Sequence, residues 1–242
     1  VIVESTEEIL SADTLHYWLN SEYAEFKSNG SIENKNIHVK ANKGWVNQKD
    51  GKAFLSEKIQ ITDLENDYVL HADSCYLFNE MSHSISYGNT LLSLPLNEDT
   101  LYLTADTLIH QQKTESNLLK AYPNVSFKSS DLLGHCDSLS FITKDEDIFL
   151  NKTPVIWLDE FQVTADTIRI VLDEDRIKMA LLNKSSFITS KIDSSAFNQI
   201  SGENMKAYFN KNELSNIKVE GNGESIYYVE DDKDNKPIGV NK

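Results

Sequence analysis

Arginine, proline and glycine are all scarce in this chain of 242 residues. Four prolines and nine glycines exclude a collagen-like or linker-like chain. The longest purely apolar stretches are a few residues, far short of the roughly 20 that a membrane-spanning helix needs. The chain opens at Val1 without a Met or a charged-then-apolar leader, so we expect a mature protein from which any export signal has been removed.

Positive charge is scarce as well. The chain has 23 Lys and Arg against 38 Asp and Glu, a net charge of −15, and its only arginines are Arg169 and Arg176. Nucleic-acid binding depends on clustered Lys and Arg that neutralise phosphates, so this composition predicts no nucleic-acid partner. The sequence also has no polybasic stretch of the kind that binds anionic membranes.

The residues that are plentiful point to β-structure. Hydrophobic residues make up 40% of the chain, enough to bury a core. Asn, Ser and Thr are frequent and alternate with β-branched and aromatic residues, which is typical of many short strands joined by polar turns. No stretch has a sustained apolar period of 3.6 residues with helix caps, so we predict no substantial helix.

One phrase of eight residues recurs along the chain. Its clearest copy is Leu103-Thr104-Ala105-Asp106-Thr107-Leu108-Ile109-His110, and other copies begin at Leu10, Leu70 and Val163. We name its acidic or Asn residue the marker. The markers are Asp13, Asn42, Asp73, Asp106, Asp137, Asp166 and Glu203, at spacings of 29 to 37 residues.

The columns of this internal alignment have a physical meaning. The residue three before the marker is apolar in six of the seven copies, the residue just before it is small, and the residue two after it is mostly apolar. The apolar period of two therefore changes parity across the marker. A β-bulge or a corner produces such a switch.

A second alternating segment follows each copy after a polar turn, so each repeat is a two-strand unit. One unit cannot bury its apolar face alone, whereas stacked units can. We therefore predict about seven two-strand repeats that form one elongated all-β domain over residues 1–230, with two facing sheets around an apolar interior. Residues 231–242 are predicted to be a polar C-terminal tail of a chain that continues further.

The repeated Ala-Asp-Thr-Leu strand with its Gly-Asn-type turn resembles the LptA/OstA-like proteins of lipopolysaccharide transport. The segments Ile200–Phe209 and Val219–Tyr228 resemble the larger OstA-like proteins of Bacteroidetes-type bacteria. The resemblance covers nearly the whole chain. It implies an open β-jellyroll, in which two antiparallel sheets form a V-shaped trough.

The resemblance also implies a function without catalysis. It implies that the chain is a periplasmic, outer-membrane-associated protein that holds the lipid A acyl chains of lipopolysaccharide between its sheets. The expected partners are lipopolysaccharide, other Lpt-type envelope proteins that pair through strand edges, and further copies of the chain in a head-to-tail oligomer. The alternative is a structural or adhesive β-repeat scaffold that binds no lipid.

The residues predicted to line a lipid trough come from the columns three before and two after the marker. They are Leu10, Leu15, Leu70, Leu103, Leu108, Leu139, Val163, Ile168, Ile200 and Met205. Six aromatic residues are candidates either for the same trough or for the core. They are Tyr17, Trp18, Phe26, Trp45, Phe141 and Trp157.

No motif in the sequence indicates an enzyme, a metal site or a cofactor, and we expect none of these. The marker carboxylates are explained better by bonds to local backbone than by a calcium ladder. Cys75 and Cys136 lie in different columns of repeats two apart, about 10 Å in a stacked arrangement, too far for a disulfide. We predict two free, buried thiols.

Overall fold

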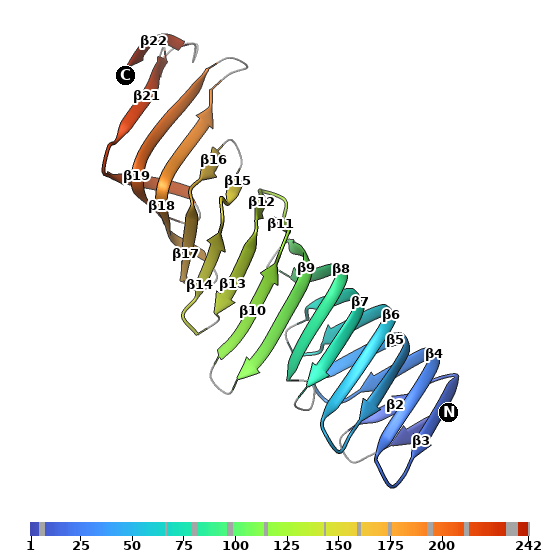
Figure 1. The fold of residues 1–242 in the computed structure, drawn as a ribbon. Coiled ribbons are helices and arrows are strands. Elements are labelled where there is room, and N and C mark those ends of the chain that lie inside the picture. The colour runs from blue at the N-terminus through green and yellow to red at the C-terminus, as the bar shows by residue number, and fades with distance from the viewer. Residues whose placement is uncertain are drawn as a thin grey trace. The chain divides into compact units, whose positions relative to one another are not determined.

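A computed structural model describes residues 1–4, 8–65, 67–78, 82–95, 99–113, 116–142, 144–158, 161–173, 176–192, 196–210, 213–230 and 237–241. Within these residues the chain is all-β, with antiparallel strand pairs and no helix. The all-β prediction is therefore confirmed, but the strands include a closed ten-stranded barrel and not a clearly open jellyroll trough. The chain forms two compact units, Val1–Ser130 and Asp131–Lys242, and the repeat occurs in both (Figure 1).

Unit 1 contains the strands that are blue to green in Figure 1. They are β1 (Ile2–Glu4), β2 (Ile9–Ser11), β3 (Thr14–Trp18), β4 (Tyr23–Glu33), β5 (Ile37–Asn47), β6 (Lys52–Asp63), β7 (Val69–Phe78), β8 (His83–Pro95), β9 (Thr100–Lys113), β10 (Ser116–Tyr122) and β11 (Val125–Lys128).

Unit 2 contains the remaining strands. They are β12 (Leu132–Cys136), β13 (Ser138–Ile142), β14 (Asp147–Asn151), β15 (Val155–Leu158), β16 (Phe161–Thr164), β17 (Thr167–Asp173), β18 (Arg176–Lys191), β19 (Phe197–Asn210), β20 (Glu213–Glu220), β21 (Glu224–Glu230) and β22 (Pro237–Asn241).

The long strands each bend at the marker, so that the continuous antiparallel sheet has two parts with separate pairing. In β5, Ile37–Lys40 pair with one half of β6 and Lys43–Asn47 pair with its other half, with a register shift between them at the marker Asn42. We call the sheet formed before the markers the first sheet and the one after them the second sheet. In unit 1 the first sheet has the strand order β1-β2-β4-β5-β6-β7-β8-β9-β11, and the second has β3-β4-β5-β6-β7-β8-β9-β10.

Unit 2 repeats this plan with shorter strands. Its first sheet has the order β12-β15-β16-β18-β19-β21-β22, and its second has β13-β14-β17-β18-β19-β20. The marker Glu203 lies inside β19 at a register shift, opposite residues 184 and 185 of β18. The predicted corner at the marker is confirmed in both units.

A second corner brings the chain back from the second sheet to the first, and positive φ angles form it. The residues with positive φ at these return corners include Ser28, Asn29, Glu57, Lys58, Gly88, Asn89, Asn124, Lys184, Ser185, Gly221 and Asn222. Two such residues oppose one marker, as Ser28 and Asn29 oppose Asn42, which is the geometry of a β-bulge. The Asn-Gly-type punctuation in the sequence therefore lies at these return corners.

Marker side chains hold the return corners. The Asn29 amide donates to Asp13 Oδ2 at 2.8 Å, and Asn124 donates to Asp106 Oδ2 at 2.8 Å. The Asp13 backbone N–H also donates to the Ser28 carbonyl, at 3.0 Å. The marker carboxylate is thus a structural group, but its partner is the side chain of a corner asparagine and not the local backbone that we predicted.

Small residues beside the markers allow the two sheets to approach. Ala12, Ala41, Ala72, Ala105, Cys136 and Ala165 are all buried. A Cβ on Gly30 would lie 2.0 Å from the Phe26 ring, so the buried Phe26 fills the space that this glycine leaves empty. Because these residues are small, the two sheets can approach each other closely at the marker corners.

The single domain over residues 1–230 with a polar tail stays a prediction. Contacts divide the chain after Ser130, and Pro237–Asn241, within the expected tail, form β22 on β21. Residues 231–236 and Lys242 of that tail lie outside the described residues.

Candidate functional site between the two sheets

The side chains between the sheets are the candidate ligand surface, and the ten predicted residues all project from this interior layer. Six of them are fully buried: Leu10, Leu70, Leu103, Leu108, Ile168 and Met205. Four are half-buried: Leu15, Leu139, Val163 and Ile200. A buried side chain offers no free surface to a ligand. Of the ten predicted residues, only the four half-buried ones expose surface that a ligand can contact.

Much of the interior of unit 1 is packed. In its second sheet, Ala24, Val46, Ala53 and Leu77 form a directly paired row that is buried throughout. The facing first sheet contributes Ile32, Val39 and Ile61, which are also buried. This interior is therefore a hydrophobic core.

Polar side chains connect the two sheets of unit 1 at the margin away from the corners. The Tyr17 hydroxyl, from β3 in the second sheet, donates to Gln48 Oε1 at 3.0 Å. Gln48 Nε2 donates to Glu8 Oε2, next to β2 in the first sheet, at 3.4 Å. Burial raises the pKa of the Glu8 carboxyl, and the hydrogen bond from Gln48 opposes that rise. These hydrogen bonds connect the two sheets at this margin.

A second connection lies farther along the same margin. Tyr68, next to β7 in the first sheet, meets His110 of β9 in the second sheet edge-on, with 5.9 Å between ring centroids. Burial raises the pKa of Tyr68, with smaller contributions from the charge of Asp63 and its hydrogen bond. Burial also lowers the pKa of the His110 imidazole, an effect that Asp63 opposes and His83 reinforces.

Unit 2 has a different interior layer at the same repeat positions. Phe141, Ile148 and Ile170 form a directly paired row in its second sheet, equivalent to the row that contains Tyr17, Val46 and Leu77 in unit 1. All three are half-buried and apolar. In the first sheet of unit 2, Leu158 pairs with Phe161, and both are also half-buried.

We name this half-buried apolar group the unit 2 interior surface. Its members are Leu139, Phe141, Ile148, Leu158, Phe161, Val163, Ile170 and Ile200. It lies above a buried layer next to the corners, formed by Leu150, Ile168, Leu182 and Met205. Unit 2 therefore combines a packed base with apolar surface that stays partly accessible.

The aromatic candidates separate into different environments. Phe26 is core, Tyr17 belongs to the polar margin and Phe141 belongs to the unit 2 interior surface. Trp18 and Trp45 lie on the opposite face of their strands, the outer face of the second sheet of unit 1, because Tyr17 and Val46 face inward. The prediction that these two tryptophans fill the core or a trough is wrong.

We also searched the described residues for a disulfide, a metal site and a pocket. Cys75 and Cys136 are free and buried, as predicted. No group of three or more His, Cys, Asp and Glu in the described ranges is placed to hold a metal ion. A shallow depression of about 430 Å³ lies beside the corners of β18 and β19, lined by Ser185, Ser186, Phe187, Ser201, Gly202, Glu203 and Asn222.

No protein-family model and no curated protein matches the chain. Among the residues that the structure describes, none forms a helix of the length and apolarity required to cross a bilayer.

Proposed function

We propose that the chain binds lipopolysaccharide through its lipid A acyl chains and helps to carry it across the periplasm to the outer membrane, without catalysis. The acyl chains would lie on the unit 2 interior surface, between two sheets that form an open trough away from their corners. The proposal is supported by one observation above all: Phe141, Ile148 and Ile170 in the second sheet of unit 2 are only half-buried, whereas Val46 and Leu77 at the equivalent positions of unit 1 are buried.

The energetics favour an acyl ligand at such a surface. Burial of hydrocarbon stabilises a complex by about 0.8 kcal/mol for each methylene removed from water. Phe141, Ile148 and Ile170 offer adjacent apolar side chains on three neighbouring strands. Several methylenes of one chain would therefore contact them together.

Strand edges suit the proposed partners. Among the described residues, β1 pairs only with β2, and β3 pairs only with β4. The other edge of each strand has unpaired backbone groups, and a partner strand can add to such an edge. Pairing with Lpt-type envelope proteins, or with a further copy of the chain, would use these edges.

A scaffold without a lipid ligand is the second candidate, and the packed interior of unit 1 favours it. Photo-crosslinking separates the two. Benzoylphenylalanine placed at Phe141 or Phe161 should crosslink to added lipopolysaccharide, whereas the same group at Tyr102, exposed on the outer face of the first sheet of unit 1, should not.

Two results would contradict the transport proposal. Folded protein that binds no lipopolysaccharide would favour the scaffold. Bound lipopolysaccharide that crosslinks at Tyr102 and not at Phe141 or Phe161 would remove the unit 2 interior surface as its site.

A further inference from the structure

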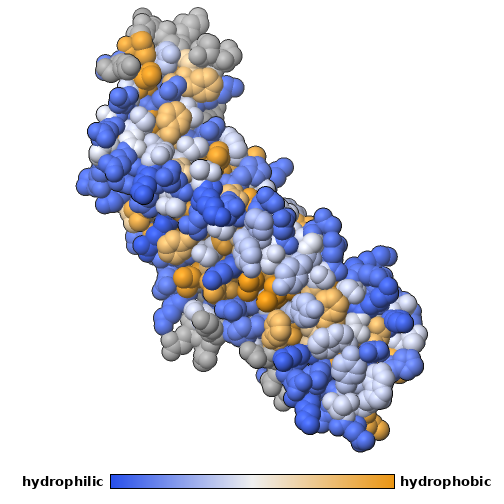
Figure 2. Space-filling model, viewed as in Figure 1, coloured by the Kyte–Doolittle hydropathy of each residue, from blue (hydrophilic) through white to orange (hydrophobic). Residues whose placement is uncertain are grey.

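The last return corner of unit 2 contains an Asn-Gly pair that lies outside the strands. Gly221 and Asn222 have positive φ, 78° and 49°, and Gly223 follows them before β21 begins at Glu224. These three corner residues are exposed to solvent. Figure 2 shows hydrophilic residues over the left edge of unit 2, where Figure 1 places β21.

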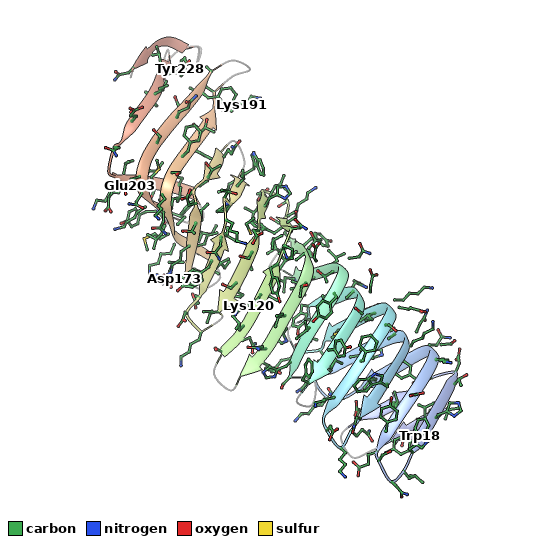
Figure 3. The ribbon with its side chains drawn as sticks, in the orientation of Figure 1. Trp18, Lys120, Asp173, Lys191, Glu203 and Tyr228 are labelled. Carbon is green, nitrogen blue, oxygen red and sulfur yellow. The ribbon has the colours of Figure 1, made fainter. Side chains whose placement is uncertain are left out.

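The asparagine of this corner is not held in the way that its counterparts in unit 1 are. At three corners of unit 1 the asparagine amide donates to a marker aspartate, as Asn29 does to Asp13 at 2.8 Å. Glu203, labelled in Figure 3, is the marker of the last repeat and the only glutamate among the markers. Its carboxylate lies against Gly221, because a Cβ on that glycine would be 2.7 Å from Glu203 Oε2. Among the residues that the structure describes, no hydrogen bond joins the Asn222 amide to Glu203, so this amide can turn.

The same pair occurs once more in the sequence, as Asn29-Gly30 in unit 1. There Gly30 is buried inside β4 and is paired with Ala41 of β5. The Asn29 amide is held by Asp13. The chain therefore contains one enclosed and one open Asn-Gly pair, and the two have the same covalent chemistry.

We propose that Asn222 is a modification site, at which the folded chain deamidates spontaneously through a succinimide with Gly223. The backbone nitrogen of Gly223 attacks Cγ of Asn222 and loses its proton to water, and the side-chain nitrogen leaves as ammonia. Water then adds to either carbonyl of the succinimide ring and opens it. Addition at one carbonyl gives aspartate, and addition at the other gives isoaspartate.

Two features of the corner favour this reaction. Glycine has no Cβ, so its backbone nitrogen can approach the asparagine side chain closely. Gly223 lies between β20 and β21, outside the pairing of either strand, so it can move without breaking the sheet. Gly30 also lacks a Cβ, but it must leave its pairing with Ala41 before its nitrogen can attack.

Deamidation would change the corner in charge and in backbone length. Asn222 and Glu203 line the same shallow depression, so the product places a second carboxylate beside the marker. Isoaspartate also adds the side-chain methylene to the main chain between β20 and β21. This inference goes beyond lipopolysaccharide transport and does not depend on it.

The two Asn-Gly pairs provide a matched test within the full chain. Folded protein is incubated at mildly alkaline pH, and peptide mapping by mass spectrometry follows both asparagines. We expect Asn222 to react first, with isoaspartate as the major product. We expect Asn29 to react at least about tenfold more slowly, because its reaction requires local opening of β4. In denaturant the two asparagines should react at similar rates, because only the shared dipeptide chemistry remains.

Gly223→Ala tests the route through the succinimide. A Cβ on this glycine would lie 3.1 Å from Val219 Cγ1, so the valine side chain must shift slightly to accept it. The added methyl group hinders attack by the backbone nitrogen, so deamidation of Asn222 should become slower. The rate at Asn29 should not change. Circular dichroism checks that the variant is folded.

Three outcomes would overturn the proposal. The first is an Asn222 that stays intact in the folded chain and reacts only in denaturant, because the corner would then protect it. The second is equal rates at Asn222 and Asn29 in the folded chain. The third is aspartate without isoaspartate at a rate that Gly223→Ala leaves unchanged, which would mean direct hydrolysis of the amide.

Discussion

The Asn89 side chain donates a hydrogen bond to the marker carboxylate of Asp73, with 2.7 Å between Nδ2 and Oδ2. Asn89 follows Gly88, and both have positive φ, 44° and 70°. Asp73 lies where β7 passes from the first sheet to the second, and Asn89 lies where β8 returns. One side-chain contact therefore ties the outward and the return corner of the same repeat.

The first prediction concerns this corner. Asn89→Gly keeps the freedom to adopt positive φ and loses the hydrogen bond, so we expect it to lower the free energy of unfolding by about 1 kcal/mol or less. Asn89→Ala loses both, and we expect a loss of about 2 kcal/mol. Urea denaturation measures the difference. Equal effects of the two variants would show that the backbone conformation contributes nothing.

The second prediction uses the only two arginines. Arg169 donates from Nε to Asp147 Oδ1 at 3.1 Å and from a terminal nitrogen to Oδ2 at 2.6 Å, and Asp147 is buried. Arg169→Ala leaves a buried carboxylate without this partner, and we expect it to destabilise the chain by about 2–3 kcal/mol. Arg169→Lys should be intermediate, because lysine cannot form the paired bonds.

Arg176→Ala is the matched control. Arg176 is exposed at the start of β18, and we expect a change within about 0.5 kcal/mol. If Arg169→Ala has no greater effect than Arg176→Ala in thermal unfolding, the pair with Asp147 does not stabilise the fold.

The third prediction concerns pH. Burial lowers the pKa of His110 in the folded chain, so the unfolded chain binds a proton at a higher pH than the folded chain does. The stability associated with His110 is present above the unfolded pKa, about 6.5, and is lost as the pH falls through the folded pKa. Asp63, Tyr68 and His83 face this imidazole.

His110→Phe tests it, since the equivalent position of a later repeat is Phe141. We expect unfolding free energies measured from neutral to mildly acidic pH to fall less steeply in this variant. Parallel curves for His110→Phe and the parent would contradict the assignment.

The fourth prediction concerns the thiols. Burial raises the pKa of Cys75 to about 11 and that of Cys136 to about 12. The thiolate is the reactive form, so both cysteines should resist a thiol reagent at mildly alkaline pH until denaturant is added. Lys40→Cys supplies an exposed thiol as the reference. Modification of Cys75 at the rate of that reference, in folded protein, would be incompatible with its burial.

Much of the fold was readable from the repeat. The change of parity at Asp106 predicts a corner, and β9 has a register shift there because β-strand side chains alternate and only an extra residue can switch their face. The small residues just before the markers, such as Ala72 and Ala105, are buried. These features are local, so a single strand and its marker contain the information.

The sequence predicted the candidate site only in part. Leu108 and Leu139 occupy the same column, yet Leu108 is 2% exposed and Leu139 is half-buried. The sequence could not separate them, because the difference depends on how closely the facing sheet approaches.

By itself the sequence determined the all-β class, the repeat and the corners, because alternation, small residues and Asn or Gly at bends act over a few neighbouring residues. The tertiary structure alone decided which interior is packed and which is accessible. Tyr17 meets Gln48, 31 residues away, and Tyr68 meets His110 from the opposite sheet. Burial is a property of both facing layers together, and these layers come from strands that only folding brings together.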